Sequence, residues 1–212
     1  MLRRENIPPA QDVEQLDVLT YKPVLYLYPT EKTDINVKLS FKNSEIMHPY
    51  PAYNDGWNVT ATPDGSLINK QTGREHYCLF WESKGSNIIE RFQTGFVVKG
   101  AETATFLEEK LRILGLLPKE SNEFIIFWLP MMENNAYNVI YFAQSEYQSM
   151  TDLQITPKPD ALLRIMMVWQ PTNEALILPE QKLPQTPVRK GFTAVEWGGQ
   201  KLDNALILVK NR

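Results

Sequence analysis

Apolar and polar residues alternate along several short stretches of this chain, which is the pattern of a strand with one buried face. Between residues 35 and 41, Ile, Val, Leu and Phe alternate with Asn, Lys and Ser. Turn sequences such as Asn54-Asp55-Gly56 and Pro63-Asp64-Gly65 bound further short runs, because glycine accepts the positive φ of a tight turn. The stretch from 57 to 82 is therefore predicted to be an antiparallel meander. The predicted strands are 21–29, 35–41, 57–62, 66–69, 76–82, 96–99, 123–129, 137–142, 162–169, 191–197 and 205–209.

A spacing of three or four residues between apolar positions predicts one clear helix near 103–114. Thr105 and Glu108 are placed to form a capping box at its start. Gly115 and Pro118 are predicted to end it, because glycine suits the position after a helix and proline blocks continuation. A second, short helix is predicted at 145–151.

These elements predict an α+β fold of mostly antiparallel, sandwich-like sheet, with a single β-rich domain over 21–212. A boundary near 100–120 stays open, since the late strands fit either a separate unit or the first sheet. Residues 1–20 are polar, contain Pro8-Pro9 and show no period, so they are predicted to be an extended N-terminal arm.

Composition excludes several classes of function. The 212 residues are 43% hydrophobic and 22% charged, as in ordinary globular domains, and the net charge of -3 argues against nucleic acid as a partner. No apolar run is long enough for a transmembrane segment. The single cysteine, Cys78, excludes an internal disulfide, and no metal-ligand spacing or cofactor motif is present, so we predict no metal and no cofactor.

Several segments resemble a group of bacterial proteins of no known activity. They are Lys22-Pro23-Val24-Leu25-Tyr26-Leu27-Tyr28-Pro29, Tyr53-Asn54-Asp55-Gly56-Trp57, Phe80-Trp81-Glu82, Trp128-Leu129-Pro130 and Glu196-Trp197-Gly198-Gly199. The resemblance spans roughly residues 22–200 and implies one shared fold and a bacterial envelope or secreted location, since members often carry export signals. The N-terminus shows positive charge without an apolar segment behind it, which predicts a cytoplasmic protein if that terminus is native.

Two carboxylates, Glu82 and Glu196, each stand beside a tryptophan after a short apolar run. Strand alternation places each glutamate on the face opposite its tryptophan. If both face one cleft, they form the acid pair of a glycosidase-like hydrolase. The other interpretation places each at a strand end, solvated or in an ion pair.

Arg164 lies on the same strand face as Leu162, Met166 and Val168, an unusual place for a charge. A buried guanidinium requires a partner, so we expect an ion pair with Glu196 or Glu82. The alternative is that Arg164 points into a cleft and binds an anionic ligand.

Tyr50, Tyr53 and Trp57 cluster near turns. Aromatic side chains in such a place either stack on a glycan or a proline-rich peptide or plug the end of the sheet. Because no catalytic motif is present, we favour a non-catalytic binding or interaction module with a surface near these residues. The alternatives are the hydrolase using Glu82 and Glu196, and an assembly protein that docks through residues 1–20.

Overall fold

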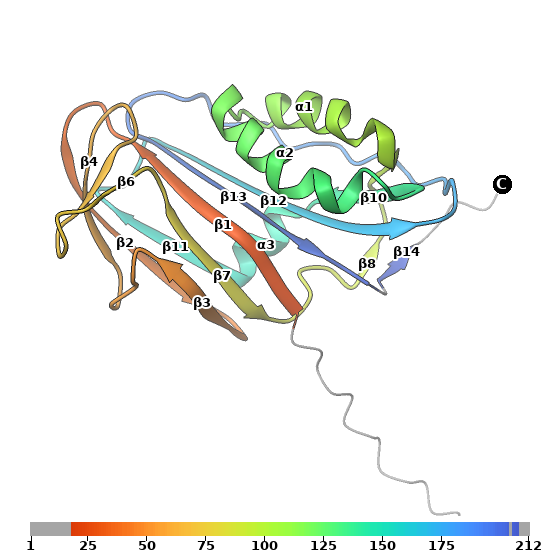
Figure 1. Cartoon of the computed structure of the whole chain (residues 1–212), viewed down its shortest axis with the longest axis horizontal. Coiled ribbons are helices and arrows are strands. Elements are labelled where there is room, and N and C mark those ends of the chain that lie inside the picture. The colour runs from red at the N-terminus through yellow and green to blue at the C-terminus, as the bar shows by residue number, and fades with distance from the viewer. Residues whose placement is uncertain (1–17, 204, 208–212) are drawn as a thin grey trace, which may run out of the picture.

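The computed structural model describes residues 18–203 and 205–207, in which two large β-sheets pack face to face and a third sheet has two short strands. Helices α1 (Thr103–Ile113) and α2 (Pro118–Met132) cover the outer face of the larger sheet (Figure 1). The larger sheet has seven strands in the order β3 (Ser44–Tyr50), β7 (Leu79–Gly85), β1 (Val18–Tyr28), β13 (Thr193–Lys201), β12 (Ala161–Thr172), β10 (Tyr137–Phe142) and β9 (Phe96–Lys99). The smaller has five, in the order β11 (Thr151–Thr156), β2 (Thr33–Phe41), β4 (Trp57–Ala61), β5 (Leu67–Asn69) and β6 (Glu75–His76).

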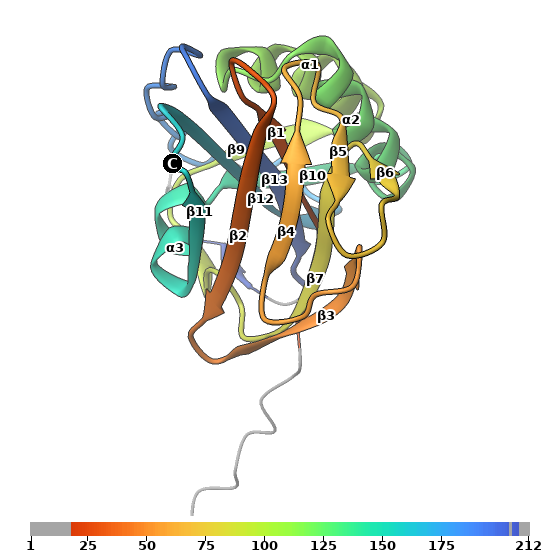
Figure 2. The same ribbon diagram turned by 90° about the vertical axis from the view of Figure 1, so that its left-hand side faces the viewer.

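Most strand pairs are antiparallel, as predicted, and the α+β sandwich-like fold is confirmed. Two pairs are parallel: β12 with β13, and the short β8 (Arg91–Phe92) with β14 (Leu206–Ile207). Figure 2 shows the smaller sheet in front of the larger one. The helical elements are η1 (Gly100–Glu102), α1 (Thr103–Ile113), α2 (Pro118–Met132) and α3 (Gln144–Met150).

The two faces of the larger sheet carry separate cores. Leu25, Trp81 and Ala194 face the smaller sheet, where they meet Val37 and Trp57. On the opposite face, the core combines side chains from the strands with those of α1 and α2, among them Val24, Val195, Leu107, Phe124 and Trp128. Adjacent strand residues therefore point into different cores, as the period of two requires.

The predicted strand at 123–129 is wrong, because these residues belong to α2. Phe124, Trp128 and Met132 recur every four residues and are completely buried, whereas Ile126 is 72% exposed. Burial at a spacing of four residues is typical of a helix that packs one face against a core. Helix α1 ends at Ile113, before Gly115 and Pro118, as predicted, and Pro118 also occupies the first turn of α2, where no backbone donor is needed.

Other boundaries also differ from the prediction. The strand expected at 76–82 is broken: β6 belongs to the smaller sheet and β7 to the larger one. Strands β3, β8 and β11 were not predicted. Helix α1 begins at Thr103, so Thr105 lies inside its first turn rather than at a cap. The described part of the predicted arm, 18–20, is already strand β1, and residues 1–17 lie outside the described residues.

Candidate functional site

Glu82 and Glu196 point to opposite faces of the seven-stranded sheet. On β7, Phe80 packs against the helix-side core and Trp81 against the core between the sheets, so Glu82 shares the face of Phe80. On β13, Ala194 faces the smaller sheet and Trp197 the helices, so Glu196 shares the face of Ala194. The backbone of the sheet lies between the two carboxylates, and they cannot act as the acid pair of a hydrolase.

Neither glutamate lies at a strand end, contrary to the prediction. Strand β7 continues to Gly85 and β13 to Lys201. Strand β13 continues past Trp197 because two glycines follow it. A Cβ on Gly199 would lie 2.5 Å from a ring carbon of Trp128 and 2.7 Å from the Met167 carbonyl oxygen, so only glycine fits there without displacement.

Glu196 forms the expected ion pair with Arg164, and both side chains are buried. The two residues lie opposite each other in the parallel β12–β13 pair. Arg164 Nε and Nη2 both donate to the Glu196 carboxylate, the second at 3.4 Å, while Nη1 donates to the Thr151 carbonyl oxygen at 2.9 Å. The Tyr147 hydroxyl donates to Glu196 Oε1 at 2.7 Å.

Electrostatics agree with a structural role for this group. Burial acts to lower the pKa of Arg164, but the Glu196 carboxylate outweighs it, and the pKa is raised. Burial and the charge of Glu196 raise the pKa of Tyr147 well above its usual value. Because the guanidinium already bonds to a carboxylate and a carbonyl, the structure does not support Arg164 as a site for an anionic ligand.

Glu82 pairs with His48 on the surface. Its Oε2 lies 2.9 Å from His48 Nδ1, and the side chains are 20% and 67% exposed. A polar contact this exposed contributes little to stability.

The predicted aromatic surface at Tyr50, Tyr53 and Trp57 does not exist as a single patch. Trp57 is 1% exposed, and its Nε1 donates to the Pro51 carbonyl oxygen at 2.8 Å. Tyr53 stacks edge-on against Trp57, with ring centroids 4.7 Å apart, and its hydroxyl lies 2.9 Å from the Leu39 amide nitrogen. Both plug the core between the sheets. Only Tyr50, at 61% exposure, remains open to solvent.

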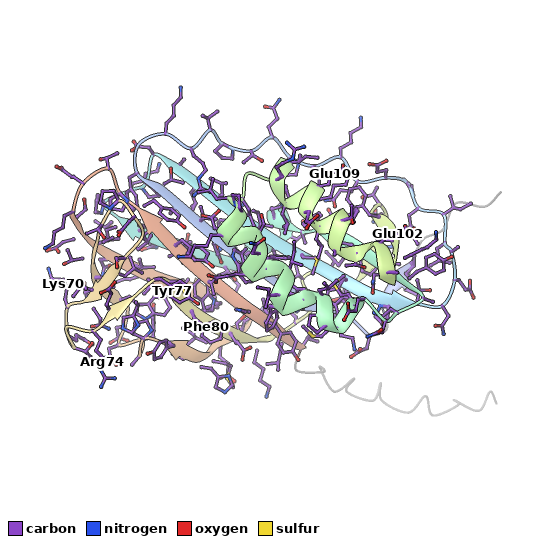
Figure 3. The ribbon with its side chains drawn as sticks, turned by 45° about the horizontal axis from the view of Figure 1, so that its top comes forward. Lys70, Arg74, Tyr77, Phe80, Glu102 and Glu109 are labelled. Carbon is purple, nitrogen blue, oxygen red and sulfur yellow. The ribbon has the colours of Figure 1, made fainter. Side chains whose placement is uncertain are left out.

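Tyr50 instead lines a pocket of about 350 Å³ on the helix side of the larger sheet, which we name the Tyr50–Tyr77 pocket. Its lining residues are Lys22, Val24, Tyr50, Glu75, His76, Tyr77, Cys78 and Phe80. Tyr77 is 53% exposed, and the rings of Tyr50 and His76 meet edge-on at 5.2 Å. Figure 3 shows Tyr77 and Phe80 beside α2. Sequence reasoning missed Tyr77 because it assigned this residue to a continuous buried strand.

Charged groups surround the aromatic rings of this pocket. The Lys119 ammonium of α2 lies 5.5 Å from the Tyr77 ring centroid. The Lys22 ammonium lies over Phe127 and Trp197, at 5.0 and 5.5 Å from the ring centroids. One carboxylate oxygen of Glu75 accepts from the Ser66 hydroxyl. The pocket thus combines ring faces with groups that bond to hydroxyls.

Burial, followed by the nearby charge of Glu123, raises the pKa of the Cys78 thiol to about 12. The thiol therefore stays protonated near neutral pH and does not act as a nucleophile. Burial, and the neighbouring Arg74 charge, lower the pKa of His76, so its imidazole is predominantly neutral at pH 7.

The segments that carry the family resemblance meet in space. Gly198 lies against the backbone of Pro23, and Gly199 against Trp128. Trp57 and Trp81 lie 5.8 Å apart by ring centroids in the core between the sheets. These segments therefore fit a role in holding the fold.

Comparison of the chain with protein-family models, with curated proteins and with solved structures finds no match. Within residues 18–203 and 205–207, no cluster of three or more His, Cys, Asp or Glu side chains is placed to hold a metal ion. In the same residues, no helix has the length and hydrophobicity needed to span a membrane.

Proposed function

We propose that this protein is a non-catalytic binding module, that the Tyr50–Tyr77 pocket is its ligand site, and that the ligand is a glycan. The observation that carries the proposal is the exposure of Tyr50 and Tyr77, at 61% and 53%, although both line one pocket. Single exposed aromatic residues are common, but two at the same concavity are typical of a binding site.

The shape of the pocket supports a small ligand. Its volume of about 350 Å³ lies at the lower end of the range for small-molecule sites. Val24 is buried and Phe80 partly buried beneath the two exposed tyrosines, so part of the lining is held by the core. A largely preformed site loses little conformational entropy on binding.

The chemistry of the lining supports a glycan rather than a peptide. Sugar rings present C–H faces that stack on the tyrosine rings, while their hydroxyls both donate and accept hydrogen bonds. Glu75 supplies an acceptor, and the Tyr50 hydroxyl makes no hydrogen bond to any other described residue. The location in the bacterial envelope, which only the family resemblance implies, stays a prediction.

The absence of catalysis in this proposal follows from two geometric findings. Glu82 and Glu196 lie on opposite faces of the sheet, and Glu196 is held in a buried ion pair. In addition, the thiol of Cys78, which lines the pocket, has a pKa raised to about 12.

A glycan array followed by calorimetry on the retained glycans tests the proposal. We expect Tyr77→Ala and Tyr50→Ala each to weaken binding about tenfold, as loss of a tyrosine at the centre of an interface does. Ile126→Ala is the matched control, because Ile126 is an exposed apolar residue of α2 that does not line the pocket.

The control variant should bind as the unaltered protein does. An array that retains no glycan, or tyrosine variants with unchanged affinity, would overturn the proposal. Binding of proline-rich peptides in place of glycans would show that the ligand of the pocket is a peptide and would overturn the glycan assignment.

A further inference from the structure

The last strand of the larger sheet, β9, has an open edge. It pairs with β10 and with no other strand of the described chain. The Gly100 amide points toward β10, where it donates to the Ala136 carbonyl oxygen, whereas the Gly95 amide points away and donates to the Pro179 carbonyl oxygen. Because backbone direction alternates along a strand, the N–H and C=O of Val97 point away from β10.

A groove of about 700 Å³ lies along this edge, and we name it the β9 groove. One wall is the edge of β9, and the opposite wall is the irregular segment 176–180, in which Ile177 is 47% exposed. Phe96 and Phe106, with ring centroids 5.1 Å apart, provide an apolar surface between them. The groove thus combines unpaired backbone groups with apolar contact area.

The rim of the groove is acidic. The charged residues lining it are Glu102, Glu109, Glu180 and Lys110, three negative and one positive, which leaves a net charge of -2. Glu102 and Glu109 each accept from a lysine at 3.0 Å, while Glu180 has no charged partner among the described residues. Figure 3 shows Glu102 at the end of η1 and Glu109 on α1, apart from Tyr77 and Phe80.

A lysine side chain of the protein itself already occupies part of this surface. The Lys110 ammonium lies 5.1 Å from the Phe96 ring centroid and 5.6 Å from that of Phe106. Ring faces attract cations, so the same surface is suited to an incoming basic side chain.

We propose that the β9 groove binds an extended basic segment of a partner protein, which pairs with β9 as an additional strand. Backbone hydrogen bonds to Val97 would align this segment. Lysine or arginine side chains of the segment lie over the Phe96 and Phe106 rings and pair with Glu109 and Glu180. This site is independent of the glycan pocket, because β9 and the Tyr50-bearing strand β3 form opposite edges of the sheet.

The test uses a short peptide of alternating lysine and valine with blocked ends. A second peptide has the same side chains but carries N-methyl groups on alternate backbone nitrogens, which removes its strand-pairing donors. We expect the first to bind with a dissociation constant below about 1 mM and to shift the amide resonance of Val97. The methylated peptide should bind about tenfold more weakly.

Charge reversal at two adjacent residues distinguishes binding in the β9 groove from nonspecific attraction between a basic peptide and an acidic protein. Glu109 lines the groove, whereas its neighbour Glu108 is equally exposed and does not. Glu109→Lys should weaken binding about tenfold and Glu108→Lys by less than about twofold. Circular dichroism melting checks that both variants fold.

Equal affinity for the two peptides would overturn the proposal, as would equal losses in the two variants. Failure of the unmethylated peptide to bind, or a shift that misses Val97, would do the same. The peptide comparison needs no substitution in the protein, so a variant that fails to fold does not affect it.

Discussion

Replacing Glu196 by glutamine should sharply destabilise the fold, although the two side chains have nearly the same shape. Glu196 is completely buried, and its partner Arg164 is 9% exposed. The substitution removes the negative charge and leaves the guanidinium buried with neutral acceptors alone, the Thr151 carbonyl oxygen and the glutamine carbonyl. Breaking one side of a buried ion pair costs about 3–5 kcal/mol, so Glu196→Gln should lower the free energy of unfolding by that amount.

A double variant separates the charge from the packing. In Arg164→Met with Glu196→Gln, the glutamine carbonyl still accepts from the Tyr147 hydroxyl, and no charge is left unpaired. We expect the double variant to be at least about 1 kcal/mol more stable than Glu196→Gln alone, because an apolar replacement of a buried pair is often neutral.

Urea unfolding followed by circular dichroism measures both effects. Glu82→Gln is the control, since it alters a polar contact in which His48 is 67% exposed, and it should cost about 1 kcal/mol or less. The reasoning is refuted if Glu196→Gln lowers the free energy of unfolding no more than Glu82→Gln does. It is also refuted if the double variant loses as much free energy of unfolding as Arg164→Met and Glu196→Gln, each made alone, lose together.

Three further predictions follow from packing and burial. Trp57→Ala should lower the free energy of unfolding by about 3–5 kcal/mol, because Trp57 is core rather than surface, and a loss below about 1 kcal/mol in urea unfolding would contradict that. Gly199→Ala should cost about 1–3 kcal/mol, since its Cβ would lie 2.5 Å from a Trp128 ring carbon, and an unchanged melting temperature would be inconsistent with this contact. With its pKa raised to about 12, Cys78 should react with iodoacetamide at pH 8 far more slowly in the folded protein than in urea; equal rates would show that the thiol is neither buried nor shifted.

The ion pair of Arg164 could be predicted from the sequence because a charged side chain within an apolar strand is buried and needs a partner of opposite charge. The same local reasoning was wrong for α2, where the run from Phe124 to Trp128 is apolar at every position. Short apolar runs fit a strand and a helix equally well. The helix was decided by packing, which buries Phe124 and Trp128 and exposes Ile126.

The candidate site was only partly predictable. The alternation of Trp57, Val59 and Ala61, all buried, was a signal that Trp57 faces the core, and the prediction did not use it. No comparable signal marked Tyr77. Its exposure follows from the break between β6 and β7, where the chain passes from one sheet to the other. Such a break depends on pairing between distant segments, which local patterns do not contain.

The most direct test of the proposed binding site is fluorine NMR on protein labelled with 3-fluorotyrosine, titrated with a glycan retained on the array. Tyrosine-to-phenylalanine variants assign each resonance. We predict that the resonances of Tyr50 and Tyr77 shift with the glycan concentration, while those of the partly buried Tyr53 and the buried Tyr147 stay in place. Binding that leaves Tyr50 and Tyr77 unchanged would contradict the assignment of the pocket.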